Sequence, residues 1–177
     1  MLGTYYFNAG VVYSVTVRTL TDNTTVCADA VRFAKSDTPP PPANETIIDN
    51  TSSATERVGT WPVSGAAHPY GTNSVYCRER DCSFTWLFTP EKTAWYEVAM
   101  WWTVISSRSS VAPVEIESDD GTDFLTVNQL ADGGMWNVLG KYQFTQGTTY
   151  RVTIRTLTDK SSICADAMRF SETIAPP

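Results

Sequence analysis

The sequence predicts an all-β protein, built as an antiparallel β-sandwich of the jelly-roll kind with a tandem repeat. Strand-like runs of about 4–8 residues recur along the chain, and Gly, Pro, Asn and Asp separate them at the spacing typical of sandwiches. We find no convincing helical periodicity. Aromatic residues make up 12% of the chain and charged residues only 18%, so the chain can bury a real core.

One segment of 32 residues occurs twice. Residues 2–33, LGTYYFNAGVVYSVTVRTLTDNTTVCADAVRF, align without gaps with residues 139–170, LGKYQFTQGTTYRVTIRTLTDKSSICADAMRF, and 19 of the 32 positions are identical. Each copy predicts three short strands, of which the last ends at Phe33 or Phe170.

The middle strand of each copy carries alternating apolar residues that would share one face of a sheet. They are Tyr13, Val15 and Val17 in the first copy and Tyr150, Val152 and Ile154 in the second. Three strands alone cannot bury such a face, so we expect these side chains to pack against another piece of protein, a neighbouring subunit included. The sequence leaves open which copy completes the sandwich that residues 46–138 begin.

Four consecutive prolines in AKSDTPPPPANE indicate an extended spacer, because proline cannot donate a hydrogen bond to a sheet. The spacer separates two structural parts of the chain. We expect a closing segment of a preceding repeat at 1–34, a Pro-rich linker at 35–45, a complete β-sandwich module at 46–171, and the start of another linker or a tail at 172–177.

Charge and motifs exclude several classes of function. The net charge of −6 and a pI near 4.7 give no basic face for nucleic acid, and no apolar run approaches the roughly 18–20 residues of a membrane helix. With one histidine and no nucleophile motif, we expect no enzyme, no cofactor and no metal. Asp119, Asp120 and Asp123 could offer oxygens to calcium, but an Asp-Gly turn between two strands explains them without a metal.

The four cysteines fall into two kinds. Cys77 and Cys82 bracket a polar RERD turn, a spacing that lets a disulfide join two hairpin strands and that favours an oxidising compartment. Two free thiols are the alternative, and His68, the only histidine, cannot complete a zinc site with them. Cys27 and Cys164 lie at matching places in apolar strands, where we expect buried free thiols.

The segment WYEVAMWW supplies the first candidates for ligand binding, since sugars need flat aromatic faces that reach solvent. Alternation assigns one set to the core, Tyr96, Val98, Met100 and Trp102, and the other set to a partly exposed face, Trp95, Glu97, Ala99 and Trp101. The candidate carbohydrate-binding residues are Trp61, Tyr70, Trp95, Trp101 and Arg108. Ordinary packing or a solvated loop is the alternative for each, and we expect Trp86 and Trp136 in the core.

Two further sets of residues carry weaker expectations. Sequons at Asn23, Asn44 and Asn50 predict glycosylation only weakly, because a chain rich in Ser and Thr contains such triplets by chance. Asp29 and Asp166 are flanked by small and apolar residues, so we expect partly buried carboxylates that accept hydrogen bonds from backbone N–H groups.

Several motifs in order resemble the golvesin/xanthan-lyase carbohydrate-binding-like domain. They are IIDNTSSATERVGTW, FTWLFTPEKTAWYEVAMWW, SSRSSVAPVEI, VNQLADGGMWNVLGKYQF and CADAMRF, and the resemblance covers 46–170, with its final segment also covering 1–33. It implies a non-catalytic β-sandwich, an accessory module of secreted bacterial enzymes or of large exported proteins with tandem repeats. Trp95, Thr103 and the loop between Cys77 and Cys82 depart from the family pattern.

Two functions follow as hypotheses. The first is an extracellular or cell-surface module of a larger repetitive secreted protein, which binds polysaccharide or mediates surface adhesion. The second is a structural subunit of an extracellular fibre or filament, in which closing strands, 1–33 or 139–170, pack against or exchange with neighbouring subunits. The expected partners are neighbouring repeats or subunits and a polysaccharide, without nucleic acid or membrane insertion.

Overall fold

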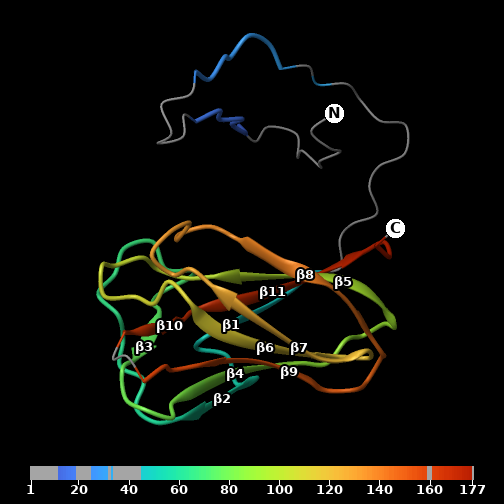
Figure 1. Ribbon diagram of the computed structural model, residues 1–177. Helices are drawn as coiled ribbons and strands as arrows, with labels where there is room; N and C mark the ends of the chain where they lie inside the picture. Colours follow the sequence, from blue (N-terminus) through green and yellow to red (C-terminus); the bar gives the residue numbers. More distant parts are fainter. Residues whose placement is uncertain (1–11, 19–24, 32, 34–44, 159–160, 177) are drawn as a thin grey trace. The chain divides into compact units, whose positions relative to one another are not determined.

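The computed structural model describes residues 12–18, 25–31, 33, 45–158 and 161–176. The chain divides into two units, Met1–Ala43 and Asn44–Pro177, and each is described by itself. In the second unit the described residues form strands and turns without a helix, and two main sheets face each other (Figure 1). The predicted all-β antiparallel sandwich is therefore confirmed. Nowhere in the described ranges is there a helix long and apolar enough to cross a membrane.

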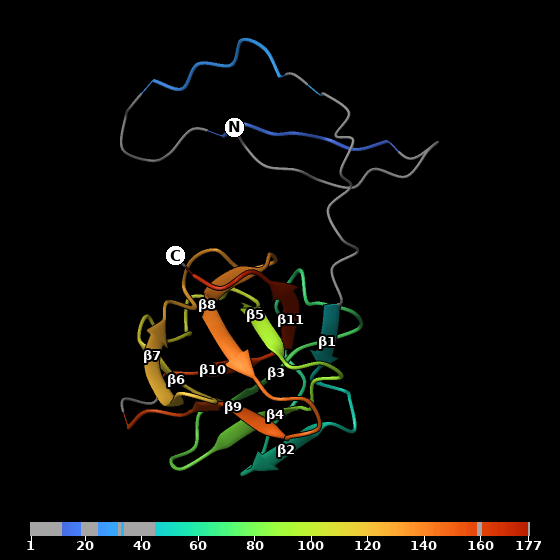
Figure 2. The ribbon, with the colours of Figure 1, turned by 90° about the vertical axis from the view of Figure 1, so that its right-hand side faces the viewer.

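Eleven strands in the described residues form two main sheets and one small sheet. Their bounds are β1 Glu45–Asp49, β2 Thr55–Val58, β3 Val75–Cys77, β4 Ser83–Phe88, β5 Ala94–Trp101, β6 Ala112–Ser118, β7 Gly121–Val127, β8 Asn137–Phe144, β9 Tyr150–Arg155, β10 Ile163–Ala165 and β11 Ala167–Thr173. One sheet has the order β1-β11-β5-β8 and the other β2-β4-β9-β6-β7, while β10 and β3 form a small third sheet. Figure 2 shows the two main sheets as two layers, one with β8, β5, β11 and β1 and the other with β6, β9, β4 and β2.

The core lies between the inner faces and follows the alternation of the strands. The set assigned to the core in β5 is buried: Tyr96, Val98, Met100 and Trp102 expose at most 4% of their surface. Aromatic rings join the sheets, and the rings of Phe88 on β4 and Phe170 on β11 stack with centroids 4.0 Å apart. Burying such large apolar side chains is the main favourable contribution to folding.

The second copy of the repeat completes the chain's own sandwich. Its strand β9 lies between β4 and β6, and its strand β11 lies between β1 and β5. Val152 and Ile154 are fully buried and Tyr150 is 7% exposed. The expectation that these three residues pack between subunits is thus wrong for this structure, because strands of the same chain flank β9 and β11 on both sides.

The first copy of the repeat differs from the second. The described residues 12–18, 25–31 and 33 belong to no strand, although the repeat predicts strands there. Val15 and Val17 are 50% and 56% exposed, whereas their counterparts Val152 and Ile154 are buried. Three strands need an opposite sheet to bury their apolar face. The predicted strand before Gly10 lies outside the described residues.

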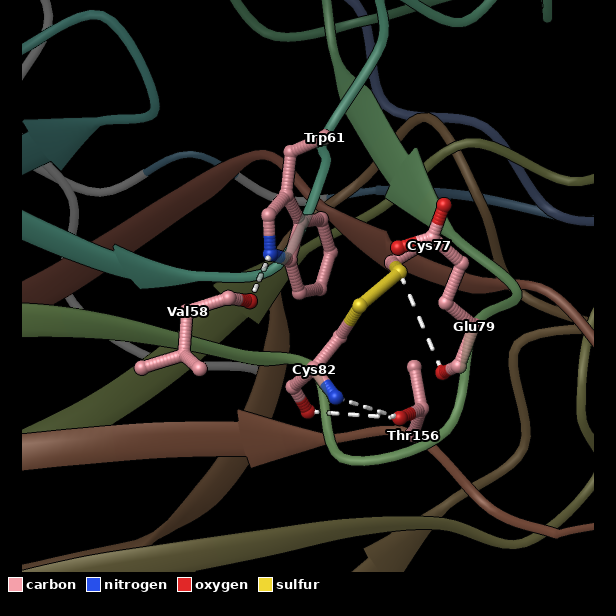
Figure 3. The surroundings of a disulfide bond; sticks show 6 residues. All are labelled: Val58, Trp61, Cys77, Glu79, Cys82 and Thr156. Carbon is pink, nitrogen blue, oxygen red and sulfur yellow. Dashed lines mark hydrogen bonds between the residues drawn. A yellow bond between two sulfur atoms is a disulfide. The ribbon is translucent and has the colours of Figure 1, made fainter.

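A disulfide joins Cys77, at the end of β3, to Cys82, just before β4, as the sequence predicts (Figure 3). The backbone N–H of Cys82 donates to the hydroxyl of Thr156 at 3.0 Å, which ties the bridge to the end of β9. Trp61 lies beside the disulfide and donates its indole N–H to the carbonyl of Val58 at 3.0 Å. Of the two remaining cysteines, Cys164 is buried as expected, but Cys27 is exposed.

Candidate functional site

The outward face of the β1-β11-β5-β8 sheet carries the candidate site. In β5 the side chains Trp95, Glu97 and Trp101 alternate with the buried set and are half-buried. Arg169 lies on the same face of β11, since it pairs with Ala99 in the register of β5 and β11. The alternation that fills the core therefore leaves aromatic and charged groups on one outer surface.

Three half-buried aromatic rings meet at one end of this face, and we call Tyr70, Trp101 and Trp136 the aromatic cluster. The ring centroids of Tyr70 and Trp101 are 5.7 Å apart, those of Tyr70 and Trp136 are 5.2 Å apart, and those of Trp101 and Trp136 are 5.4 Å apart. Edge-to-face and tilted contacts of this kind hold rings in fixed orientations. The cluster unites a loop before β3, the end of β5 and the loop before β8.

Hydrogen bonds tie both loops to the end of β5. The indole N–H of Trp101 donates to the carbonyl of His68 at 3.0 Å. The indole N–H of Trp102 donates to the carbonyl of Ala131 at 2.8 Å, and the N–H of Gly134 donates to the carbonyl of Trp102 at 2.9 Å. Hydrogen bonds thus connect the segments that carry Tyr70 and Trp136 to the end of β5.

Charged groups adjoin the aromatic cluster. The guanidinium of Arg169 lies 5.2 Å from the ring centroid of Trp136. It also donates to Glu97 at 3.1 Å and lies 3.8 Å from a carboxylate oxygen of Glu45. A guanidinium held this way keeps its direction and can offer donors to hydroxyl or carboxylate groups. Aromatic rings beside such polar groups can bind a sugar by stacking and hydrogen bonding.

A groove of about 400 Å³ lies between the edge strands β7 and β8 of the two sheets. Its lining residues are Trp102, Leu125, Thr126, Val127, Asn128, Asp132, Asn137, Val138 and Leu139. Asn137 directly follows Trp136, so the groove opens next to the segment that carries one ring of the aromatic cluster. Its mixed polar and apolar lining extends the surface on which a long ligand could lie.

The structure brings together two of the five predicted carbohydrate-binding residues. Tyr70 and Trp101 touch within the aromatic cluster. Trp95 lies at the other end of the same face, opposite Gln143 of β8 and Thr173 of β11. Alternation along the strand placed Trp95 and Trp101 on one face. It could not show which loop residues would contact Trp101.

The other two candidates lie inside the protein. Trp61 is 7% exposed and packs its ring against Phe84 at 5.3 Å. Arg108 is 3% exposed, and burial lowers the pKa of its guanidinium. Neither side chain reaches the surface where a polysaccharide would bind. The segment around Arg108 looks like a solvated loop because serines surround it, yet Ser107 and Ser109 form hydrogen bonds with Ser162 inside the protein.

Arg108 is held by neutral acceptors from three segments. It donates to the carbonyl and the hydroxyl of Thr103, at 3.2 and 3.1 Å. It also donates to the hydroxyl of Ser64 at 2.9 Å and to that of Ser162 at 3.2 Å. Arg108 therefore joins loops on one side of the sandwich, and we give it a structural role.

Sequence reasoning missed three residues of the site. Trp136 was assigned to the core but is half-buried in the aromatic cluster. Arg169 is half-buried between the fully buried Met168 and Phe170, and that alternation was a usable signal. Glu45 was assigned to the predicted linker, 35–45, but it is the first residue of β1. Its place opposite Ser171 depends on the pairing of β1 with β11, which no local pattern reveals.

The acidic turn before β7 uses its carboxylates internally. Asp119 and Asp120 form the turn between β6 and β7. Asp119 accepts hydrogen bonds from the hydroxyls of Thr145 and Tyr150. Asp123 accepts one from the hydroxyl of Tyr142 at 2.9 Å, and burial together with this bond raises the pKa of Tyr142. The turn interpretation thus accounts for these residues.

The sequons have different outcomes. Asn50 is 1% exposed and its amide nitrogen donates to the side-chain oxygen of Asn73 at 3.0 Å. A glycan on that nitrogen would have no room in the folded chain, so the weak prediction for Asn50 is not supported. Asn23 and Asn44 lie outside the described residues.

Asp166 is buried as the sequence indicates, but only one of its two carboxylate oxygens has a hydrogen-bond partner among the described residues. It is fully buried, and one carboxylate oxygen accepts the N–H of Tyr70 at 3.2 Å. The other oxygen has no hydrogen-bond partner among the residues described. Burial, with a further contribution from Asp49, raises the pKa of Asp166 to about 7. Asp29 lies in the first unit, where it is exposed.

Comparisons with known proteins agree with this architecture. Residues 46–172 match the family model described as the Golvesin C-terminal domain. A xanthan lyase from Bacillus sp. (strain GL1) is 32% identical over 134 residues, which cover 70% of this chain and 14% of that protein. The structure of a Paenibacillus xanthan lyase superposes with a TM-score of 0.67 at 31% identity, over 73% of this chain and 13% of that one.

The fold also occurs in a family 35 carbohydrate-binding module from an environmental isolate. The TM-score is 0.53 at 11% identity, and the match covers 74% of this chain and 99% of the module. At that identity the likeness concerns the fold alone. The chain spans only a small part of the two xanthan lyases that it matches.

Proposed function

Since this chain belongs to the Golvesin C-terminal domain family, we propose that its sandwich is a non-catalytic module that binds polysaccharide outside the cell. The observation that carries the proposal is the aromatic cluster beside Arg169. Tyr70, Trp101 and Trp136 are half-buried rings with fixed orientation, and a guanidinium adjoins them. This is the combination that sugar rings need for stacking and for directed hydrogen bonds.

The polar groups of this face suit the hydroxyl groups of sugars. Arg169 can offer its donors to such hydroxyls, and it lies between the two acidic side chains that orient it. Two relatives are named xanthan lyases, so xanthan is the first ligand to test. Trp95 and Trp101 are six residues apart on one strand, about 20 Å at 3.3 Å per residue. An extended chain can contact both, whereas a single sugar cannot.

A binding role fits the acidic groups of this face better than catalysis. Glu45 and Glu97 both interact with Arg169, so neither stands as a free acid or base beside the aromatic cluster. Glycoside hydrolysis needs two carboxyl groups with different protonation states on opposite sides of a bond. The disulfide supports a location outside the cell, because such bonds persist in oxidising compartments.

Binding of the full chain to xanthan and to a neutral glucan tests the proposal. We expect Trp101→Ala and Trp136→Ala each to weaken xanthan binding about tenfold in isothermal titration calorimetry, which corresponds to about 1.4 kcal/mol. Phe124→Ala is the matched control, because Phe124 is 71% exposed on the other sheet. Unchanged binding in both Trp variants would reject the face as the site.

We propose that the first unit links this chain to a neighbouring repeat or subunit, and the exposure of its apolar residues supports this second function. Val15 and Val17 are exposed, while their counterparts in the second copy are buried. Residues 2–33 would complete a sandwich that begins with a segment like 46–138, either in a neighbouring repeat or in a neighbouring subunit. Linking units in this way would build an adhesive stalk or a fibre.

The double variant Val152→Asp/Ile154→Asp tests this second function. It prevents the chain's own closing segment from packing, so exchange predicts a folded assembly in which residues 2–33 replace that segment. Analytical ultracentrifugation and circular dichroism would detect the assembly. Adding Val15→Asp and Val17→Asp to the double variant should then abolish the assembly, because residues 2–33 could no longer pack in the sandwich. A double variant that is simply unfolded and monomeric would contradict the exchange.

A further inference from the structure

Three buried side-chain oxygens lack a hydrogen-bond partner among the residues that the structure describes. They are Oδ2 of Asp49, Oδ1 of Asn50 and Oδ1 of Asp166. Asn50 is 1% exposed and Asp166 is fully buried. Buried polar atoms in folded proteins nearly always have a partner, and a set of unpaired oxygens in one region indicates a group that binds them.

All three side chains lie next to one loop, residues 70–73. The N–H of Tyr70 donates to Asp166 at 3.2 Å. A Cβ atom at Gly71 would lie 3.3 Å from the unpaired oxygen of Asp49. The side-chain oxygen of Asn73 accepts from the amide of Asn50 at 3.0 Å. One short loop therefore touches each member of the set.

Strand pairing explains why residues far apart in sequence meet here. β1 pairs with β11 in antiparallel register, and Asp49 lies opposite Ala167, which directly follows Asp166. The end of β1 therefore lies beside the start of β11. The negative charge of Asp49 adds to the effect of burial in raising the pKa of Asp166, which agrees with their proximity.

The remaining polar atoms of these side chains are already used. The other oxygen of Asp49 accepts from the N–H of Thr51 at 2.9 Å and from its hydroxyl. None of the ion pairs found among the described residues includes Asp49 or Asp166. The guanidinium of Arg57 approaches, but it donates to the backbone carbonyl of Asn50 at 2.7 Å. Two acidic side chains thus lack a direct positive partner.

We propose that Asp49, Asn50 and Asp166 bind one calcium ion beneath the 70–73 loop. Carboxylate and amide oxygens are the ligands that calcium prefers, and two carboxylates balance its charge. Calcium takes about 6–8 oxygens, so these three side chains form only part of the shell, with carbonyl oxygens or water as the rest. Zinc is a poor fit, because the set offers no sulfur or nitrogen ligand.

Calcium at this place would join β1, β11 and the loop that carries Tyr70. The pKa values, the polysaccharide and the second proposed function are not needed for this site, which depends on the placement of the oxygens alone. Its test therefore measures ion binding and stability rather than ligand binding.

The test compares the full chain in EDTA and in calcium chloride at equal ionic strength. We expect one calcium ion per chain in isothermal titration calorimetry and a rise in Tm of several degrees in thermal unfolding. Asp49→Asn and Asp166→Asn should bind calcium at least tenfold more weakly and lose the rise in Tm. These amide variants keep the side-chain shape and remove a buried charge, so they should fold.

Asp120→Asn is the matched control, since Asp120 is an exposed acid in the turn before β7. It should keep both the stoichiometry and the rise in Tm. Equal Tm values in EDTA and calcium, with no heat of binding, would overturn the proposal. An equal response of Asp166→Asn and the wild type would also overturn it.

Discussion

Arg108 shows how a single side chain can mislead a reading of local sequence. Its neighbours in SSRSS are small and polar, which is typical of a solvated loop, and the guanidinium suits a ligand. The structure instead buries it, and the polar neighbours Ser107 and Ser109 bond to Ser162, across the loop before β10. The acceptors of the buried cation, Thr103, Ser64 and Ser162, all lie outside SSRSS, so the local composition could not reveal its burial.

Arg108→Ala should destabilise the sandwich by about 3 kcal/mol. The change leaves the carbonyl and hydroxyl of Thr103, and the hydroxyls of Ser64 and Ser162, without their charged donor, and hydrogen bonds to charged groups are the stronger kind. Urea unfolding followed by fluorescence measures the loss. Arg78→Ala, which removes an exposed arginine, serves as the control and should change stability by less than about 1 kcal/mol.

Asp166 should make the metal-free chain less stable as pH rises. Burial raises its pKa to about 7, above the value near 3.9 in an unfolded chain. Between these values the folded state binds more protons than the unfolded state, so the free energy of unfolding falls with rising pH. The contribution of Asp166 is most favourable below about pH 4 and is lost as pH passes 7.

The measurement is the pH dependence of urea unfolding in EDTA for the wild type and Asp166→Asn. The difference between the two isolates this carboxyl from the other titrating groups of the chain. The variant should lack the decline between pH 4 and 7. Parallel curves would show that Asp166 does not titrate in this range.

At the scale of strands, periodicity predicted much of the fold. The two faces of β5 came from alternation alone, and the buried set is in the core. Periodicity could not show that β10 and β11 are separate strands. They lie in different sheets, and the break between them falls at Asp166. That change of sheet depends on pairing with β3 and β1, distant segments that no local pattern identifies.

Gln129 should stabilise β10, because its side-chain amide pairs with the backbone of that strand as a neighbouring strand would. Its side chain is fully buried, donates to the carbonyl of Cys164 at 2.9 Å and accepts from the N–H of Cys164 at 2.8 Å. Gln129→Ala leaves both backbone groups buried without a partner, which we expect to cost about 2–4 kcal/mol. Thermal and urea unfolding measure the loss.

Gln146→Ala is the matched control for that prediction, because Gln146 is exposed in the turn before β9. It should change the free energy of unfolding by less than about 0.5 kcal/mol. A small effect at Gln129 as well would mean that water replaces the amide in the variant.

At the scale of the whole molecule, the candidate site could be predicted only in part. Trp101 was identified from the alternation of β5, and Tyr70 from its place in a loop-like segment. Their meeting with Trp136 depends on two loops that are anchored to the end of β5. The unpaired oxygens of Asp49, Asn50 and Asp166 could not be predicted from sequence, because whether an atom has a hydrogen-bond partner depends on all the residues that surround it in the fold.

The same loop joins both proposed sites. The backbone N–H of Tyr70 donates to Asp166, and its ring packs against Trp101 and Trp136. If calcium orders this loop, part of the entropy cost of binding polysaccharide is already met when the ion is bound. We therefore expect calcium to tighten xanthan binding about 5-fold or more, within the usual range of coupling between sites.

By linkage, xanthan must raise the affinity for calcium by the same factor. Titrations of xanthan in EDTA and in calcium measure the first effect, and Asp166→Asn in the same buffers corrects for calcium that the polysaccharide itself binds. The variant should bind xanthan equally in both. If calcium raises Tm but leaves the Kd for xanthan unchanged in the wild type, the ion stabilises the strands without positioning Tyr70, and the two sites act independently.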